Sequence, residues 1–207
     1  MKVVDDVTRA EEQFPHLVLT VGSFDGVHLG HRRVLDEVLA SARRASGTAA
    51  VMTLRPHPRE FFAPEHAPNL LTADAKKLEL LEQAGVDVVF ILPFTSEIAY
   101  LEPIAYVEEI IHRRCHAKEV VAGHDFRFGK DAQGDYAFLR KLGPRLGFSA
   151  LQVAPLMIDG ERVSSTAIRE RLLEGDLDEA ERLLGRKYSI VGEVVPGRGI
   201  GATLGFP

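Results

Sequence analysis

The sequence predicts an α/β fold in which a doubly wound, mostly parallel sheet is covered by helices on both faces. Short apolar runs rich in Val, Ile and Leu alternate along the chain with longer segments of helical period. Such alternation implies right-handed crossovers between parallel strands. The composition, 45% hydrophobic and 27% charged residues in a chain of 207, is that of a globular protein with a sizeable core.

Five strands are expected, each a short and mostly apolar run. They cover residues 17–21, 49–54, 86–92, 119–122 and 150–153. Runs of this kind are typical of strands that are buried on both faces of a parallel sheet. The second strand ends at Arg55-Pro56-His57-Pro58, and the stretch 59–70 that follows has no clear period. We therefore expect a loop or a small lid there.

Six helices are expected from apolar residues at helical spacing. They cover residues 29–45, 72–84, 103–114, 135–146, 166–174 and 177–184. Thr72 is expected to cap the second helix and Pro103 suits the first turn of the third, while Gly47 and Gly85 stop the first and second. The last helix opens with Asp176-Leu177-Asp178-Glu179, an acidic variant of the capping box.

Composition excludes several classes of protein. With 25 Lys and Arg against 30 Asp and Glu, the formal net charge of −5 gives no long-range attraction for nucleic acid or an anionic membrane. Cys115 is the only cysteine, so an intramolecular disulfide is excluded and a reducing, cytoplasmic location is expected. Residues 1–13 lack the apolar core of a signal peptide, and no apolar run approaches the ~18 residues of a membrane span. Any bound anion must therefore be held by a local site.

The loop after the first strand is built for such an anion. Its sequence is Gly22-Ser23-Phe24-Asp25-Gly26-Val27-His28-Leu29-Gly30-His31, and it leads directly into a helix. Glycines permit close approach of the backbone, and a helix N-terminus offers free N–H groups and the positive end of its dipole. The pattern is neither the dinucleotide G-x-G-x-x-G nor a P-loop. It predicts a phosphate site.

His28 and His31 distinguish this loop, because their spacing at a helix start turns both imidazoles toward one anion. The structural alternative is one core histidine and one surface histidine. A zinc site is a further alternative, and it would need a third ligand from His57, His112, His116 or His124.

A second group of polar residues, Val163-Ser164-Ser165-Thr166-Ala167-Ile168-Arg169, stands at the start of a later helix. Hydroxyl groups in this position either cap the helix or hold a phosphate together with the arginine. Beside the glycine loop, the segment would form the second jaw of a triphosphate clamp.

These two segments resemble the H-x-G-H and S-S-T-x-x-R signatures of the nucleotidyltransferase superfamily. With Gly22-Ser23-Phe24-Asp25-Gly26-Val27-His28, Pro56-His57-Pro58 and Gly123-His124-Asp125-Phe126-Arg127-Phe128-Gly129, the chain resembles the prokaryotic FAD synthetases, which are bifunctional riboflavin kinases and FMN adenylyltransferases. The resemblance covers nearly the whole chain. It implies a Rossmann-like nucleotidyltransferase fold and the transfer of AMP from ATP to FMN, which gives FAD and pyrophosphate.

The resemblance also implies roles for individual residues. His28, His31 and Arg169 are expected to be catalytic. The ATP site is expected to comprise Gly22, Ser23, Phe24, Asp25, His28, Gly30, His31, Gly123, Asp125, Val163, Ser165, Thr166 and Arg169. The flavin site is expected to comprise Leu54, Pro56, His57, Pro58, Phe126 and Phe128. Mg²⁺ is expected to arrive with ATP and to be held through phosphates and water, with Asp25 or Asp125 as its protein contact. For Asp25, an Asx-type turn is the alternative role.

Residue 54 departs from the family pattern, since Leu54 stands where the family usually carries Phe.

The expected domains are an adenylyltransferase domain over 1–185 and, over 186–207, the truncated start of a riboflavin kinase β-barrel that opens with a strand near Ile190. Riboflavin kinase activity is not expected from this chain. Two alternatives for its function remain: another H-x-G-H adenylyltransferase with a different phosphorylated acceptor, or a non-catalytic module that binds flavin nucleotides.

Overall fold

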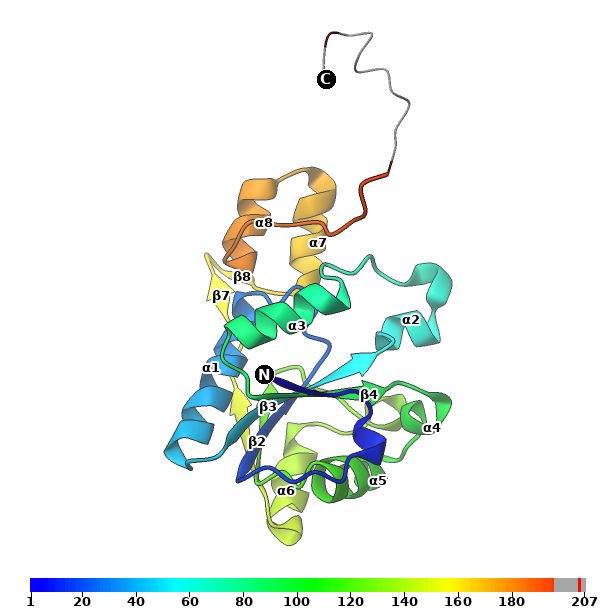
Figure 1. Ribbon diagram of the computed structural model, residues 1–207, viewed down its shortest axis with the longest axis vertical. Helices are drawn as coiled ribbons and strands as arrows, with labels where there is room; N and C mark the ends of the chain where they lie inside the picture. The colour runs from blue at the N-terminus through cyan, green and yellow to red at the C-terminus, as the bar shows by residue number, and fades with distance from the viewer. Residues whose placement is uncertain (196–204, 206–207) are drawn as a thin grey trace.

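A six-stranded parallel sheet forms the centre of the computed structural model, which describes residues 1–195 and 205 (Figure 1). The strand order is β1-β4-β3-β2-β5-β6. The strands are β1 (Lys2–Val4), β2 (Leu17–Val21), β3 (Thr48–Arg55), β4 (Val88–Pro93), β5 (Glu119–Gly123) and β6 (Ser149–Val153). A separate antiparallel hairpin joins β7 (Met157–Ile158) to β8 (Glu161–Arg162).

The order of the strands reverses at β2. This strand pairs with β3 on one side and with β5 on the other, so the connections that leave β2 and β5 diverge to opposite sides of the sheet. Ligands of open α/β sheets bind in the crevice that such a switch point leaves at the carboxyl ends of the strands.

Helices cover both faces of the sheet. The helices are α1 (Leu29–Arg44), α2 (Pro58–Phe62), α3 (Asp74–Gln83), α4 (Ser96–Ala99), α5 (Pro103–Ala105) with its π-helical continuation (Tyr106–Arg114), α6 (Tyr136–Leu146), α7 (Ser165–Glu174) and α8 (Leu177–Leu184). None of the helices in the described part of the chain is long and apolar enough to cross a membrane.

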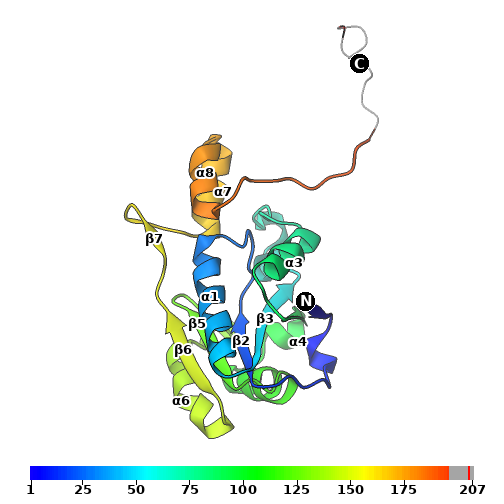
Figure 2. The same ribbon diagram turned by 60° about the vertical axis from the view of Figure 1, so that its left-hand side comes forward.

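The side chains of β2 point alternately to the two faces of the sheet and show which helices cover each face. Leu17 and Leu19 join a core cluster with residues of α6 and the π-helical segment, whereas Val18 joins a cluster with α1. Side chains of successive strand residues point to opposite faces, so one apolar strand contributes to two cores. Figure 2 shows α7 and α8 beyond the sheet, stacked on the end of α1 where that helix begins.

The five strands predicted between residues 17 and 153 and the six predicted helices are all present, with ends that differ by at most two residues. The additional elements are β1, α2, α4, the two strands of the β7–β8 hairpin and three short 3-10 helices (Val7–Arg9, Pro64–His66 and Lys130–Ala132). Residues 59–70 were expected to be a loop, yet α2 occupies their start because Pro58 fits the first turn and His57 and Glu60 form a capping box. Thr72 does not cap α3, whose N-cap is Ala73. Its hydroxyl instead accepts a hydrogen bond from the Gly26 N–H at 3.1 Å.

The strand expected near Ile190 is not formed. Residues 187–195 have no regular secondary structure, and Ile190 and Val194 are 85% and 97% exposed. A strand needs a neighbour to satisfy its backbone N–H and C=O groups, and none of the described strands lies beside this segment. Residues 196–204, 206 and 207, which make up half of the expected start of the barrel, lie outside the described residues.

Candidate active site

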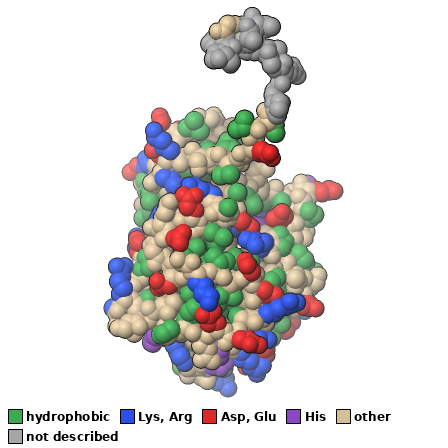
Figure 3. All heavy atoms as spheres, in the orientation of Figure 1, with side chains coloured by type: hydrophobic (Ala, Val, Ile, Leu, Met, Phe, Trp, Pro, Cys, Tyr) green, Lys and Arg blue, Asp and Glu red, His purple; other side chains and the backbone are tan. Residues whose placement is uncertain are grey.

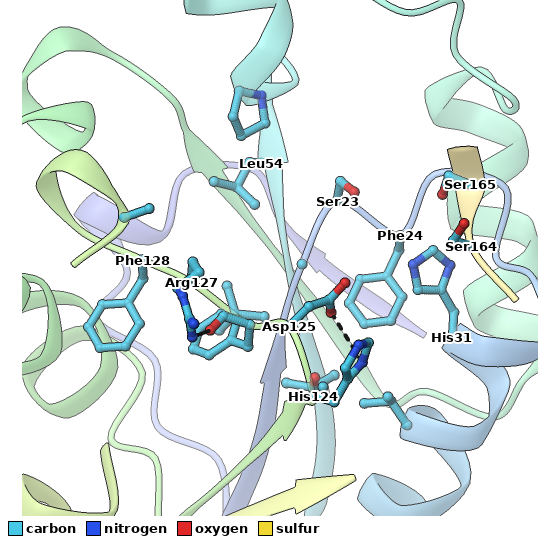
Figure 4. A pocket seen from close by; sticks show the side chains of 18 of the residues that line it. Ser23, Phe24, His31, Leu54, His124, Asp125, Arg127, Phe128, Ser164 and Ser165 are labelled. Atoms are coloured by element: carbon cyan, nitrogen blue, oxygen red, sulfur yellow. Dashed lines mark hydrogen bonds and ion pairs between the residues drawn. The ribbon is translucent and has the colours of Figure 1, made fainter. Parts of the chain in front are cut away.

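A pocket of about 740 Å³ opens at the carboxyl ends of the strands (Figure 4). Its lining comes from the segments that follow β2, β3, β4, β5 and β6 and from the start of α7. It therefore occupies the crevice that the switch point predicts. All the site residues expected from the sequence line this pocket except Asp25, Pro56 and Arg169.

The loop after β2 brings the two predicted phosphate-binding segments together. Gly30 sits where a Cβ would lie 3.1 Å from the His28 ring and 3.1 Å from the carbonyl oxygen of Val163. Only a residue without a side chain allows the first turn of α1 to lie this close to the segment before α7. Gly30 of the H-x-G-H motif thus allows the two predicted phosphate-binding segments to pack against each other.

His28 and His31 form one stacked unit. Their ring centroids are 3.6 Å apart with an interplanar angle of 16°, and the Phe24 ring lies 4.9 Å from that of His31. Nδ1 of His28 accepts the backbone N–H of His31 at 3.2 Å and so caps α1. When His28 is neutral, its proton is therefore on Nε2, which remains a donor. Figure 4 shows His31 beside Phe24, next to Ser164 and Ser165.

Both imidazoles are neutral at pH 7. Burial lowers the pKa of His28 to about 4, and Arg186 and Arg169 act in the same direction, while Asp25 and Asp125 oppose it. Burial also holds the pKa of His31 well below its usual value, with further lowering from His28 and Lys77. Nδ1 of His31 is buried and has no hydrogen-bond partner among the described residues. The pair offers neutral N–H donors in place of fixed charges.

The three hydroxyl groups at the start of α7 have different roles. Ser164 is the N-cap and accepts the Ala167 N–H at 3.2 Å. The Ser165 hydroxyl donates to the backbone oxygen of Asp25 at 2.9 Å, which fixes α7 against the glycine loop. Thr166 is exposed and lines the pocket, so it is free to meet a ligand.

Asp25 and Arg169, both expected in the ATP site, are not among the residues that line the pocket. The Asp25 carboxylate is 1% exposed and accepts the backbone N–H groups of Leu71 and Thr72 at 2.9 Å and 3.1 Å. It also forms an ion pair with Arg169, whose Nε donates to the Asn69 carbonyl at 2.8 Å. This network ties three segments together behind the pocket wall, and it leaves neither side chain facing the ligand space.

Aromatic residues line the other end of the pocket. The rings of Phe126 and Phe128 stack at 5.4 Å, and Tyr106 lies 5.3 Å from Phe128. The segment that carries the two phenylalanines leaves β5 through a turn that begins at Gly123. Leu54 is also part of this lining, and Figure 4 shows Phe128 across the pocket from His31.

The Pro-His-Pro segment contributes only in part to this end. His57 and Pro58 line the pocket, whereas Pro56, which follows a cis peptide bond, does not. Nδ1 of His57 accepts the Arg59 N–H at 3.2 Å at the start of α2. Burial lowers the pKa of His57.

Several lining residues were not predicted. Arg162, on β8, contacts His124 Nε2 at 2.8 Å and Asp125 Oδ2 at 3.2 Å, so a cation stands at the mouth of the pocket. Phe94 and Tyr106 complete the aromatic end. Arg162 directly precedes the Val163-Ser164-Ser165 segment, and Phe94 is two residues beyond the predicted strand 86–92, so position alone could have indicated both.

The donor set does not form a resident metal centre. No group of three or more His, Cys, Asp and Glu side chains that could hold a metal ion occurs in residues 1–195 and 205. The oxygens of Asp25 already serve Arg169 and two backbone N–H groups, whereas the side chain of Asp125 is 67% exposed. The residues fit an ion that is carried mainly by a ligand's phosphates, with Asp125 as the carboxylate that could contact its water shell.

The visible face of the molecule carries charges of both signs. On the face shown in Figure 3, acidic and basic side chains are interspersed. An anion would therefore be held by the local donors of the pocket, namely N–H groups of the glycine loop and α1, the two imidazoles and the hydroxyl groups of α7.

A parallel sheet with its ligand crevice at the switch point, an H-x-G-H motif at the start of one helix and an S-S-T motif at the start of another define the α/β nucleotidyltransferase class. The structure of a macrolide-efflux protein from Streptococcus pneumoniae has the same fold, with a TM-score of 0.87 and 28% identity over 99% of this chain and 66% of that one. A family model described as FAD synthetase matches residues 10–167. The chain belongs to the FAD synthetase family.

Curated relatives agree with this assignment. The chain is 37% identical over 207 residues to a bifunctional riboflavin kinase/FMN adenylyltransferase of Haemophilus influenzae, covering 100% of this chain and 67% of that protein. It is 38% identical over 190 residues to the protein of the same description from Escherichia coli strain K12, covering 92% of this chain and 61% of that protein. The chain thus spans roughly two thirds of the length of these relatives.

Proposed function

We propose that this chain is an FMN adenylyltransferase, which transfers AMP from ATP to FMN and releases pyrophosphate. The observation that carries the proposal is a single pocket with phosphate-binding donors at one end and stacked aromatic rings at the other, in a member of the FAD synthetase family. A dinucleotide product with a flavin at one end and adenosine phosphates at the other needs both kinds of lining.

In the proposed reaction, a phosphate oxygen of FMN attacks the α-phosphorus of ATP. The new P–O bond forms as the bond to the β-phosphate oxygen breaks, and the electron pair leaves with pyrophosphate. The FMN phosphate is already an anion at neutral pH, so the site needs no general base. Catalysis then consists of alignment and of stabilising the charge that develops around phosphorus.

His28 and His31 are the residues for that stabilisation. Their N–H groups would donate to oxygens of the α-phosphate, and the arriving negative charge would favour the imidazolium forms that the ligand-free pocket suppresses. Thr166 and the N–H groups at the start of α7 would hold the β- and γ-phosphates. Ser165, which donates to the Asp25 backbone oxygen at 2.9 Å, would keep the two jaws at a fixed separation.

Arg169 would act differently from the expectation based on its motif. Because its guanidinium is paired with Asp25 and Asn69, its proposed role is to support the loop that carries His28. Arg162, exposed at the pocket mouth, is the better placed arginine for the departing pyrophosphate.

The flavin would lie against Phe126, Phe128 and Tyr106. Stacking on aromatic faces suits the planar isoalloxazine, and the phenol of Tyr106 is buried, so this surface presents apolar area. Leu54 supplies aliphatic area where the family usually carries Phe. Mg²⁺ bound to the triphosphate would neutralise part of its charge, and Asp125, which lines the pocket, is a carboxylate that could contact its water shell.

The relatives' description includes riboflavin kinase as a second activity. We propose that residues 1–185 are the adenylyltransferase unit and that the segment from 186 onward leads into the part of the protein that carries the kinase. Assays with riboflavin and with FMN as alternative acceptors test the two activities separately.

Formation of FAD from FMN and MgATP tests the proposed function. The chain contains no Trp, so the quenching of flavin fluorescence as FAD forms can be followed without tryptophan background, and pyrophosphate release can be counted in parallel. The proposal expects one pyrophosphate for each FAD. Transfer of AMP to another phosphorylated acceptor but not to FMN would refute it. So would tight binding of FAD without any pyrophosphate release, which would identify a binding module.

A further inference from the structure

The backbone that presents His28 has an uncommon conformation. Gly26 has φ +87° and Val27 has φ +40°, a region that β-branched residues rarely adopt. Such a conformation persists only where the surrounding structure over-determines it. The contacts that hold this short segment therefore decide where the His28 ring lies.

Two of these contacts come from a residue far along the chain. Nη2 of Arg186 donates to the Gly26 carbonyl at 2.6 Å, and Nη1 donates to the Val27 carbonyl at 3.4 Å. The planar guanidinium is suited to hold two acceptors at once. From the other side, the Gly26 N–H donates to Thr72 and the Val27 N–H donates to the Phe24 carbonyl.

Arg186 occupies this position without a carboxylate partner. No ion pair of its guanidinium is found in the described ranges, and its Nε is buried without a hydrogen-bond partner there. Burial and the nearby Arg32 lower the pKa of Arg186. Burial costs the Arg186 guanidinium part of its hydration. Its two hydrogen bonds to the loop carbonyls are the main interactions that offset this loss.

Packing fixes the approach of Arg186 as well. It directly follows Gly185, the C-cap of α8, and a Cβ on Gly185 would collide with the Leu29 side chain at the start of α1. The turn at 185–186 is thus pressed against the junction of the loop and α1. Arg186 lies outside residues 10–167, which match the family model, and it is not among the residues that line the pocket.

We propose that Arg186 is a positioning residue for adenylyl transfer: its guanidinium holds the carbonyls of Gly26 and Val27 and so fixes the backbone that presents His28. This inference rests on the proposed function. It makes Arg186, the second residue after α8, part of the support of the active site, so a movement of the segment that follows would be transmitted to His28.

Three variants test the proposal. Arg186→Ala removes both bonds, Arg186→Lys keeps the charge but not the fork, and Lys187→Ala is the matched control at the exposed neighbouring residue. We expect kcat for FAD formation to fall by about tenfold or more in Arg186→Ala, with partial recovery in Arg186→Lys, because small displacements of reacting groups have large kinetic effects. The KM values for ATP and FMN should stay within about threefold of the wild type, since Arg186 does not line the pocket.

NMR titration of the His28 ring in the ligand-free protein is the readout that does not depend on turnover. The charged groups that influence this ring are Asp25, Arg186, Asp125 and Arg169. Loss of the Arg186 cation should raise the pKa of His28 in Arg186→Ala but not in Arg186→Lys or Lys187→Ala, and backbone shifts should concentrate in residues 24–31.

The outcomes separate cleanly. Wild-type kcat in Arg186→Ala together with an unchanged His28 titration would overturn the proposal, and so would full recovery of kcat in Arg186→Lys. A raised KM for ATP with unchanged kcat would show direct substrate contact and would also overturn it. Absence of FAD formation in the wild type would remove the proposed function, while the NMR titration would still show whether Arg186 holds the loop at His28. If Arg186→Ala does not fold, the comparison of Arg186→Lys with Lys187→Ala gives the same decision.

Discussion

At the scale of single residues, His28 combines two tasks in one ring. Nδ1 caps α1 through the His31 N–H, and Nε2 is left to donate toward a ligand. Substitutions therefore mix a structural effect with a chemical one unless the cap is preserved. An asparagine side chain can accept the same backbone N–H, since Asn is among the best N-cap residues.

A pair of substitutions at position 28 separates these tasks. His28→Ala and His28→Asn should both lower kcat for FAD formation by about 10²-fold, the usual effect of losing one donor to transition-state charge. Only His28→Ala should also lose about 1 kcal/mol of stability with the cap. Steady-state kinetics and urea unfolding measure the two effects, with His66→Ala, at an exposed histidine away from the pocket, as control. Equal stability of both variants would contradict the capping role.

The buried histidines should make stability depend on pH. The pKa of His28 is 6.5 in a model peptide and about 4 in the fold, so the unfolded chain binds more protons between these values. The stability that the neutral ring allows is therefore complete above pH 6.5 and is lost as the pH falls toward 4. At about 1.4 kcal/mol for each pKa unit, His28 contributes about 3 kcal/mol to this loss. His31 and His57 act in the same direction, because burial lowers the pKa of each.

Urea unfolding at pH 7 and pH 5 checks this pH dependence. His28→Asn should lose less stability than the wild type over the same interval, because one of the titrating groups is gone. An identical loss in both proteins would show that His28 does not carry the effect.

Arg169 should matter chiefly for stability. Removing one partner of a buried ion pair leaves the other charge uncompensated, and the Arg169 side chain is 16% exposed while that of Asp25 is 1% exposed. We expect Arg169→Ala to lower the free energy of unfolding by about 3 kcal/mol. Arg171→Ala, on the same helix with exposed ion-pair partners, should change it little. A variant that is as stable as the wild type and has a raised KM for ATP would restore the phosphate-binding role expected from the motif.

The sequence placed His28, His31 and the serines at helix starts, and the structure has them at the starts of α1 and α7, because local capping signals decide such positions. The same local reasoning could not predict that Arg169 pairs with Asp25. The two residues are 144 positions apart in the sequence, and a local sequence pattern cannot predict a contact over that separation. Asp25 was open to two interpretations in the sequence, and its contacts with Leu71 and Thr72 could be seen only once residues 69–72 had been placed beside it.

At the scale of elements, α1 and the segment that leads into α7 approach each other closely at Gly30, where a Cβ would lie 3.1 Å from the Val163 oxygen. Helix start signals in the sequence could predict both helices, but they could not predict that one would begin against the other.

Gly30→Ala tests this junction. The added Cβ would lie 3.1 Å from both the His28 ring and the Val163 oxygen, so one of the two must move. We expect a loss of stability of about 1–3 kcal/mol, as for other overpacked sites, and a lower kcat. Gly123→Ala is the matched control for stability, because its nearest neighbour, Asp125 Oδ1, would be at 3.7 Å. Gly30→Ala should therefore unfold at a lower temperature than Gly123→Ala. Equal melting temperatures would mean that the junction can accommodate the added methyl group.

Elements that the sequence did not predict are short and depend on partners. β1 has three residues and exists through its pairing with β4, and the β7–β8 hairpin is held by a single turn at Asp159-Gly160. α2 was not predicted because residues 59–70 have no clear helical period, although Pro58 is at the position where a helix accepts proline.

At the scale of the whole molecule, the pocket is assembled from both halves of the sheet. The phosphate end comes from the first half and from α7, while the aromatic end comes mainly from the segment after β5. The sequence could predict this arrangement because the strand order of a doubly wound sheet places the first and fourth of its main strands side by side. It could not predict the relation of residues 187–195 to the rest, since their exposed apolar side chains have no strand beside them.

The contacts of α7 and the 185–186 turn with the loop after β2 also determine when the site can form during folding. Ser165 contacts Asp25 across 140 residues, and Arg186 contacts Gly26 across 160. Closing loops of this length costs conformational entropy, so these contacts are not expected to form until the sheet has brought their partners together. In refolding experiments, far-UV circular dichroism should recover before the ability to bind nucleotide. On a ribosome, the sheet could be complete while the enzyme is still inactive, and competence would wait for the last helix to emerge.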